Sequence, residues 1–461
     1  MKERTIAQAL AALFAIYGVI AVALLATTIP PFQNPDEPAH LMRAEQIARG
    51  GIWGRHVTFR MPNGSEFRTS GGLADPALLQ AASPFWPIFQ HPDVRAIRAM
   101  WAPDVHWSDA LTPAQFNNTA LYPPIFYIPA AIGVAIGRAA DLSVVRTLTL
   151  ARLLTGAASV AVGTIAIAAA RGLAVWLFAI LTLPMSLACM ASAAQDGLLI
   201  TSAALAAVLL LRLRCERRAR AAAVLVVLTM VLGAVGAARP PYIGLALLPL
   251  AARAAPLGSR ILAAAAVLLI VGAWSATAVM TAYAPFVIIG ADPQGQIASL
   301  IRDPPAVASI ARDTLVGHWR EYATGFVGSL GWQDLAFSAW YYDAAFAALA
   351  AGLAAAMLRP RDEGAGARAS LLVLLGVLIS AAAIFGIEYL SWTPPGAPGV
   401  EGVQGRYFLP LALVAGLALP ALGGGRGLAR FRSALLLAVS TFPVVSIVET
   451  MRGIVGRYYL Q

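Results

Sequence analysis

The chain has 461 residues, of which 59% are hydrophobic and only 12% are charged, with a net charge of +10. No soluble globular domain has this composition. Apolar runs recur along the whole length, which predicts an all-α, polytopic integral membrane protein. The positive charge lies mainly in arginines of short loops between those runs, as is typical of cytoplasmic membrane loops. We therefore expect a lipid bilayer as partner and no nucleic acid.

The first apolar run covers residues 6–28 and is long enough to cross a bilayer. Lys2 and Arg4 precede it, so we expect the N-terminus in the cytoplasm. The run is long and no small-x-small cleavage site follows it. It is therefore interpreted as a membrane span and not as a cleaved signal.

The arginine-rich loops assign the remaining topology. They lie at Arg171 and at residues 212–220, 253–260, 359–368 and 426–432, and all are expected in the cytoplasm. The spans between them must then come in pairs. This predicts 11 spans and an external C-terminus. The expected spans are residues 6–28, 144–170, 173–191, 197–211, 221–238, 242–252, 261–283, 336–358, 371–390, 407–422 and 433–448.

Residues 122–137 are apolar but contain Pro123, Pro124 and Pro129. A full crossing here would move every later arginine-rich loop to the outside. We therefore expect a juxtamembrane or re-entrant helix, which is tolerated where protein buries its backbone.

This topology gives a single membrane domain over residues 1–461 whose hydrophilic segments all face outward. They are a large first extracytoplasmic loop with juxtamembrane helices at residues 30–142, a second loop at 284–335 and a third at 391–406. The first holds four of the ten tryptophans and four of the five histidines. The histidines lack zinc-ligand spacing, so we predict no metal site there. The tryptophans suit either the membrane interface or stacking on a sugar.

The most informative motif is N-P-D-E-P-A-H, residues 34–40, directly after the first span. Pro35 and Pro38 stiffen the turn that holds Asp36 and Glu37. A helix is expected to follow, and its N-terminus favours an ionised carboxylate. The doublet suits a general base or a cation ligand. The alternative is an ordinary helix cap.

Two further clusters lie on the expected outer face. Asp196 follows Gln195 at the turn between two spans, as a functional acid or as an N-cap. The motif G-V-Q-G-R-Y, residues 402–407, contains Gln404, Arg406 and Tyr407. The guanidinium of Arg406 is a rigid fork suited to phosphate. The alternative is an ordinary interfacial arginine.

Two more residues are candidates for substrate binding. Arg152 lies about two turns into a span. A charged side chain there costs free energy, so we take it as a candidate functional residue. His40 ends the N-P-D-E-P-A-H motif.

Acids that deprotonate a hydroxyl, beside arginines that hold a lipid phosphate, fit sugar transfer from a polyprenyl-phosphate donor. The acceptor hydroxyl needs a base, and the departing phosphate needs positive charge.

Four motifs carry a family resemblance. They are P-D-E-P-A-H, Y-P-P-I-F-Y-I-P, A-A-Q-D-G-L and G-V-Q-G-R-Y-F-L-P, spread from residue 30 to residue 410. They resemble the bacterial membrane-protein family called domain of unknown function 2142, which is itself similar to the GT-C membrane glycosyltransferases. The resemblance implies a GT-C-like fold with Asp36 as catalytic base and Glu37 beside it. It also implies Asp196 as second acid and Arg406 as donor-phosphate ligand.

The resulting prediction is an inverting glycosyltransferase of the bacterial cytoplasmic (inner) membrane. It would move a sugar from a polyprenyl-phosphate carrier to a cell-envelope glycan or a lipid-linked acceptor at the outer face. Asp36 and Asp196 could share a divalent cation. One alternative is a transporter or flippase of lipid-linked sugars, although no internal repeat is evident. The other is a non-catalytic membrane protein of an envelope complex.

Overall fold

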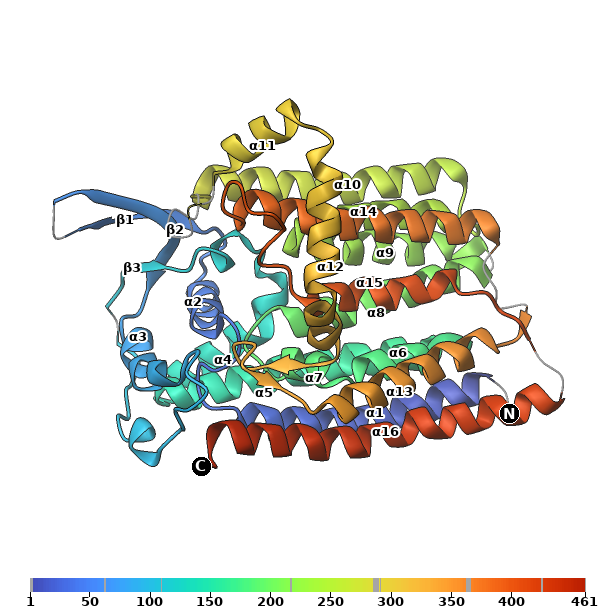
Figure 1. Ribbon diagram of the computed structural model, residues 1–461, viewed down its shortest axis with the longest axis horizontal. Helices are drawn as coiled ribbons and strands as arrows, with labels where there is room; N and C mark the ends of the chain where they lie inside the picture. Colours follow the sequence, from blue (N-terminus) through green and yellow to red (C-terminus); the bar gives the residue numbers. More distant parts are fainter. Residues whose placement is uncertain are drawn as a thin grey trace.

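Long apolar helices dominate the computed structural model (Figure 1), which describes residues 3–61, 64–108, 110–215, 218–284, 290, 292–361, 366–423 and 426–460. A helix satisfies its own backbone hydrogen bonds, so it can cross the hydrocarbon core. Among the described residues, seven helices are long and apolar enough to do so. They are α1 (Glu3–Thr28), α5 (Val144–Ala169), α8 (Asp196–Cys215), α9 (Arg218–Ala238), α10 (Leu257–Ala282), α14 (Ala367–Ser391) and α16 (Arg426–Tyr458). The chain is therefore a multi-pass membrane protein, as predicted.

The bundle has a central helix. In α8, 89% of the apolar stretch is buried inside the protein, against 22% in α14 and in α16. Apolar side chains on α14 and α16 therefore face outward, where lipid would lie. The buried helix α8 carries Asp196 at its first residue.

The predicted span at residues 173–191 is broken. Helices α6 (Ala174–Leu181) and α7 (Pro184–Met190) meet at a bend of 80°. Pro184 occupies the first turn of α7, where its missing N–H costs nothing. The pair is a bent span or a re-entrant loop, so the described helices allow seven or eight crossings.

The predicted count of 11 spans stays a prediction. The expected span at residues 336–358 corresponds to α13 (Ala339–Met357). The expected span at 242–252 corresponds to the 3₁₀ segment η6 (Pro240–Ala251). The expected span at 407–422 corresponds to the short helix Gly405–Ala418, which includes η9 (Gly405–Phe408) and α15 (Leu409–Ala415). The last two are too short to cross alone. The proline-containing segment forms η4 (Pro124–Tyr127) and α4 (Ile128–Ala139), and its membrane placement also stays a prediction.

A small antiparallel sheet projects from one end of the bundle (Figure 1), and we call this the sheet end. Its strands are β1 (Arg55–Arg60), β2 (Glu66–Ala74) and β3 (Thr112–Gln115), in the order β1-β2-β3, with Arg55 opposite Gly71 and Gly71 opposite Gln115. A Cβ at Gly71 would lie 1.9 Å from the carbonyl oxygen of Ala114, so only glycine fits there. Juxtamembrane helices were predicted for this loop, and the sheet was not.

The opposite end of the bundle gathers arginines. Arg432 pairs with Glu3, with nitrogen–oxygen distances of 2.5 and 2.7 Å. Arg359 donates to the carbonyl oxygen of Leu419 at 2.7 Å, two residues beyond the carbonyl that accepts from Arg214. The described parts of these predicted cytoplasmic turns therefore share one end with the N-terminus (Figure 1). The orientation of the bundle in the cell stays a prediction.

Two helices depart from the direction of the bundle. Helix α11 (Pro293–Arg302) packs on α14, and α12 (Ala306–Val327) runs across the long helices (Figure 1). A short hairpin follows, β4 (Ser329–Leu330) with β5 (Leu335–Ala336). Within the predicted second loop, residues 285–289 and 291 lie outside the described residues.

Candidate functional site

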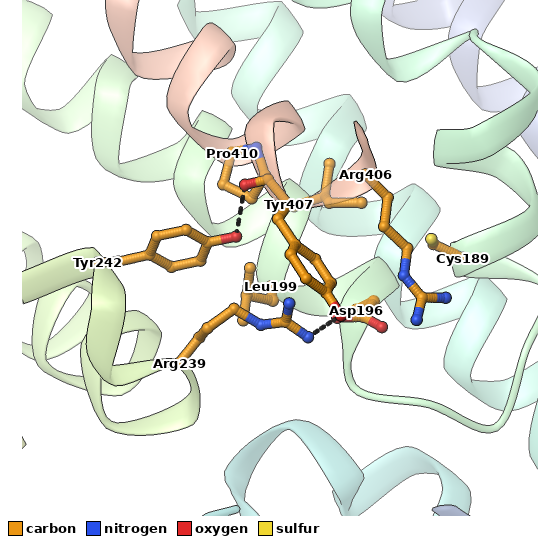
Figure 2. Close-up of a pocket in the computed structure, with 9 residues that line it drawn as sticks. Cys189, Asp196, Leu199, Arg239, Tyr242, Arg406, Tyr407 and Pro410 are labelled. Carbon is orange, nitrogen blue, oxygen red and sulfur yellow. Dashed lines mark hydrogen bonds and ion pairs between the residues drawn. The ribbon is translucent and has the colours of Figure 1, made fainter. Parts of the chain in front are cut away.

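A charged pocket lies where α8 begins (Figure 2). One part is lined by Cys189, Asp196, Leu199, Ile200, Arg239, Tyr242, Arg406, Tyr407 and Pro410. A second, larger part is lined by Asn34, Pro35, Met185, Ala188, Cys189, Ser192, Ala194, Asp196, Ser329, Leu330, Gly331 and Arg406. The two parts share Cys189, Asp196 and Arg406.

Asp196 anchors one side of the pocket. It is 8% exposed, and its Oδ1 accepts a hydrogen bond of 3.1 Å from Nη2 of Arg239. The guanidinium of Arg239 also lies over the ring of Tyr407, 4.2 Å from its centroid. Asp196 is therefore more than an N-cap of α8, because an arginine from a separate element binds its carboxylate.

Arg406 faces the same pocket without a partner. Within the described part of the chain its guanidinium donates no hydrogen bond, and its Nε is buried with no acceptor. Its closest ring contact is with Tyr407, 5.8 Å from the centroid. A guanidinium that lacks acceptors at a pocket wall is suited to bind an anion.

Backbone packing places Arg406 at that wall. A Cβ at Gly405 would come within 2.2 Å of the carbonyl oxygen of Tyr322, so glycine alone lets η9 pack against α12. The hydroxyl of Tyr242 donates to the carbonyl oxygen of Tyr407 at 2.8 Å. Gln404 precedes this turn; its Oε1 is buried without a donor and the residue does not line the pocket.

Asp36 lies beside the larger part of the pocket. It precedes α2 (Glu37–Ala48) with φ 56° and ψ 15°, a left-handed conformation that aspartate tolerates. Its side chain makes no capping hydrogen bond, so its carboxylate oxygens can accept a proton or a hydrogen bond from a ligand. Its two preceding neighbours, Asn34 and Pro35, line the pocket, and its charge acts on both His40 and Arg406.

Glu37 has a different environment although it is adjacent. It is fully buried and pairs with Arg152, with Oε1 to Nε at 2.8 Å and Oε2 to Nη2 at 2.5 Å. Arg152 donates its other hydrogen bonds to the carbonyl oxygens of Ala26, Ile29 and Pro30. All five of its N–H donors are thus used. This geometry gives the pair a structural part, joining the end of α1 to α2 and α5.

His40 lies behind the pocket and does not line it. It is 5% exposed, and its Nδ1 is 2.6 Å from the hydroxyl of Tyr127. Its ring is roughly parallel to those of Tyr122 and Tyr127, with centroids 6.5 and 5.7 Å away. Burial lowers the pKa of His40, against the opposing charges of Asp196 and Asp36, so the imidazole is neutral at pH 7.

Two residues that line the pocket, Arg239 and Cys189, and one acid outside its lining, Glu388, were not predicted from the sequence. Arg239 follows α9 at the end away from the arginine-rich turns, which was a usable signal because it breaks the charge rule. Glu388 lies inside an apolar run on α14, and Arg239 and Arg406 both act on its charge. Cys189 had no distinguishing signal.

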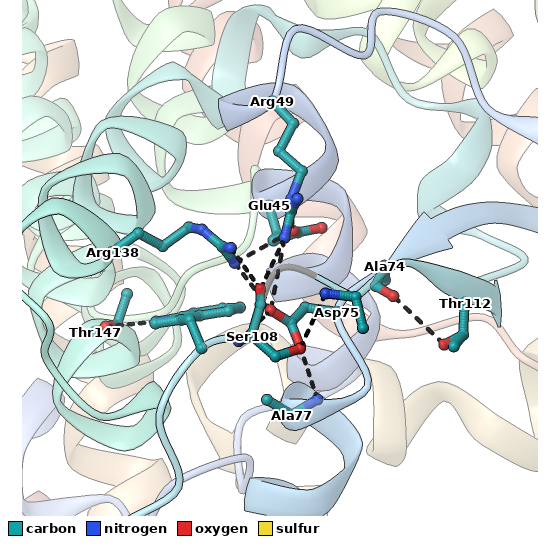
Figure 3. Close-up of polar contacts among 11 residues, drawn as sticks. Glu45, Arg49, Ala74, Asp75, Ala77, Ser108, Thr112, Arg138 and Thr147 are labelled. Carbon is teal, nitrogen blue, oxygen red and sulfur yellow. Dashed lines mark hydrogen bonds and ion pairs between the residues drawn. The ribbon is translucent and has the colours of Figure 1, made fainter.

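A second charged cluster lies nearby on the sheet end (Figure 3). Asp75 accepts hydrogen bonds from Arg138 at 3.0 Å and from the backbone N–H of Ser108 at 2.7 Å, and Arg49 pairs with Glu45. Burial raises the pKa of Glu45 despite these arginines. The cluster joins α2, α4 and the loop before β3 through these contacts, so we assign it a structural part.

The fold and the pocket together define a class: a multi-pass membrane protein with an acid- and arginine-lined pocket where its central helix begins. Residues 19–415 match the family described as "Predicted membrane protein (DUF2142)". This match covers most of the chain, which belongs to that family, as the motifs predicted. No curated protein and no solved structure matches the chain. Similarity to the GT-C enzymes stays a prediction.

Proposed function

We propose that this protein is a glycosyltransferase that uses a polyprenyl-phosphate-linked sugar at the outer face of a bacterial cytoplasmic membrane. One observation carries the proposal. Arg406 presents an unpaired guanidinium to a pocket that also contains Asp196 and borders Asp36. Transfer from a phosphate leaving group requires an anion-binding group and a carboxylate that can act as base, and Asp36 makes no capping hydrogen bond.

In the proposed reaction Asp36 is the base. It takes the proton of the acceptor hydroxyl while that oxygen forms a bond to the anomeric carbon of the donor. The bond from that carbon to the phosphate oxygen breaks on the opposite side, and the phosphate leaves with the electron pair. This geometry inverts the anomeric centre. Asp36 is preferred to Glu37 because Glu37 is bound to Arg152.

Arg406 stabilises the charge that develops on the departing phosphate. Arg239 is less available, because Asp196 already accepts from it and the ring of Tyr407 covers one face. In this proposal Asp196 holds Arg239 and tunes the positive charge of the pocket. Gln404 and Tyr407 hold the turn that carries Arg406.

The residues fit a bound divalent cation poorly. Among the described residues there is no group of three or more His, Cys, Asp or Glu side chains suited to a metal. The predicted cation shared by Asp36 and Asp196 would also lie close to two guanidinium groups, which repel it. We therefore derive no step through a metal.

The location of the pocket supports the outer face. It lies away from the bundle end where Arg432 pairs with Glu3 and where Arg359 meets Leu419. If the arginine-rich end is cytoplasmic, the pocket faces outward.

Donor binding tests the proposal. Native mass spectrometry of the protein in lipid nanodiscs would measure binding of undecaprenyl phosphate. Arg406→Ala should weaken binding by about 10–100-fold, the effect of ~1.5–3 kcal/mol for hydrogen bonds to a charged group. Arg406→Lys should also weaken it, because lysine keeps the charge and loses the fork.

Arg452→Ala is the matched control, since that side chain is 79% exposed at the same end of the bundle. It should bind like the parent. Parent-like binding by both Arg406 variants would reject the phosphate role.

A further inference from the structure

Helix α12 presents an unusual outer face. Leu315 is 53% exposed, Val316 71% and Trp319 56%, and we call these three residues the α12 face. They are neighbours on the helix at spacings of one, three and four residues. Arg312 and Arg320 flank them, and α12 is not among the helices suited to cross a membrane.

The apolar surface extends beyond α12. Ile301 on α11 is 73% exposed, and α11 packs on α14. On α14, Leu378 is 63% and Ile387 46% exposed. Since α14 is a crossing helix with most of its apolar stretch outward, its exposed surface faces lipid. The surface of α11 and α12 therefore adjoins a lipid-facing surface.

The position of α12 fits a membrane boundary. It packs on η9 and on α7, which lie where α8 begins, and it runs across the long helices (Figure 1). A helix that lies flat in the interface carries apolar residues on one face and charged residues beside them. The long arginine side chains can then reach toward the headgroups.

The same helix holds the segment that carries Arg406. Gly405 packs so closely that a Cβ would lie 2.3 Å from the backbone nitrogen of Phe326. Tyr322 contacts Phe408, with ring centroids 6.3 Å apart. Thr314 Oγ1 accepts a hydrogen bond of 2.8 Å from the backbone N–H of Val400. Both ends of the segment from 400 to 408 thus rest on α12.

We propose that the α12 face lies in the bilayer interface, and that this contact with lipid holds the segment 400–408 and Arg406 in place. The partner is the lipid surface itself, at the boundary between headgroups and acyl chains. The inference depends on the membrane class of the protein and not on the proposed glycosyl transfer.

Spin-label accessibility tests the location of the α12 face. Single cysteines would replace Val316 or, as matched control on the other side of the helix, Glu321, whose side chain is 75% exposed, in the full chain lacking Cys189 and Cys215 and reconstituted in nanodiscs. A label at position 316 should collide mainly with oxygen, which concentrates in lipid. A label at position 321 should collide mainly with a water-soluble nickel chelate. Equal nickel accessibility at both positions would place the face in water, as for a protein-docking surface, and would overturn the proposal.

Hydrogen–deuterium exchange tests the coupling. In nanodiscs, Val316→Glu should speed exchange of the amides in residues 400–408 several-fold, because the charge pulls α12 out of the interface. Asp313→Asn should leave them unchanged, and α5 should exchange equally in both variants, which shows that the bundle is intact. Unchanged exchange of residues 400–408 in Val316→Glu would show that lipid contact does not hold the segment.

Discussion

The region around Arg152 and the region around Arg406 hold the same kinds of charged side chain in opposite states. Arg152 is 1% exposed and donates five hydrogen bonds, two of them to Glu37. Arg406 lines a pocket, and in the described part of the chain it has no acceptor. Burial alone therefore does not identify a functional arginine. The proposal for Arg406 rests instead on its unused donors together with its place at the pocket wall.

The acids follow the same division. Glu37 is saturated by Arg152 and Asn34, whereas its neighbour Asp36 makes no capping bond and borders the pocket. One residue of separation in sequence thus divides a structural acid from a candidate base. Four experiments can break or sharpen this comparison.

The largest expected effect is topological and all-or-none. A cysteine replacing Asp141, whose side chain is 89% exposed, should react with an impermeant maleimide added outside intact cells. A cysteine replacing Ala429, near the Arg432–Glu3 pair, should react only after permeabilisation. Both would be made without Cys189 and Cys215. The reverse pattern would place both arginines and the whole pocket at the cytoplasmic face and end the proposed reaction.

The second effect is on the rate. Asp36→Asn keeps the size of the side chain and removes the base, so transfer should fall by ~10²–10⁴. The assay follows labelled sugar from a polyprenyl-phosphate donor into membrane glycan. Unchanged migration of the variant in gel filtration is the control for folding. Near-parent transfer would move the role of base to Asp196.

The third effect is on stability. Arg152→Met leaves the buried Glu37 charge unpaired and should lower the free energy of unfolding by about 3–5 kcal/mol. Adding Glu37→Leu should recover much of that loss. Arg406→Met, by contrast, should change it by less than about 1 kcal/mol. Thermal unfolding in detergent would compare the variants, and equal losses for Arg152→Met and Arg406→Met would erase the distinction between the two regions.

The smallest effect concerns pH. Burial lowers the pKa of His40 below 6.5 in the folded protein, so the unfolded chain binds the extra proton first as pH falls. His40 should therefore cost stability progressively below about pH 6.5, down to its folded pKa. His40→Gln should lose stability less steeply than the parent over that window. Parallel curves would show that His40 is not held neutral.

The sequence predicted much of the helical frame, because apolar length and arginine placement are local signals. Helix α1 ends at Thr28 and α5 begins at Val144, as predicted. The motif also correctly placed Asp36 immediately before a helix. The bend between α6 and α7 was missed, although Pro184 marks it, since the run remains apolar throughout.

The pairings could not be predicted, because they join distant parts of the chain. Arg152 and Glu37 are 115 residues apart, and Asp196 and Arg239 are 43 apart. A single sequence shows which charges exist but not which ones meet. The sheet had a readable signal: R-H-V-T-F-R and E-F-R-T-S alternate on either side of an N-G turn.

Helices α1 and α16 are joined by a polar contact at each end. Glu3 pairs with Arg432 at one end, and at the other the hydroxyl of Tyr459 donates to the carbonyl oxygen of Thr28 at 2.7 Å. The two helices are therefore parallel neighbours, although more than 400 residues separate their contacts. Because α16 is synthesised more than 400 residues after α1, these contacts can form only after the helices between them have been made. A chain cut before α16 would lack both of these contacts with α1.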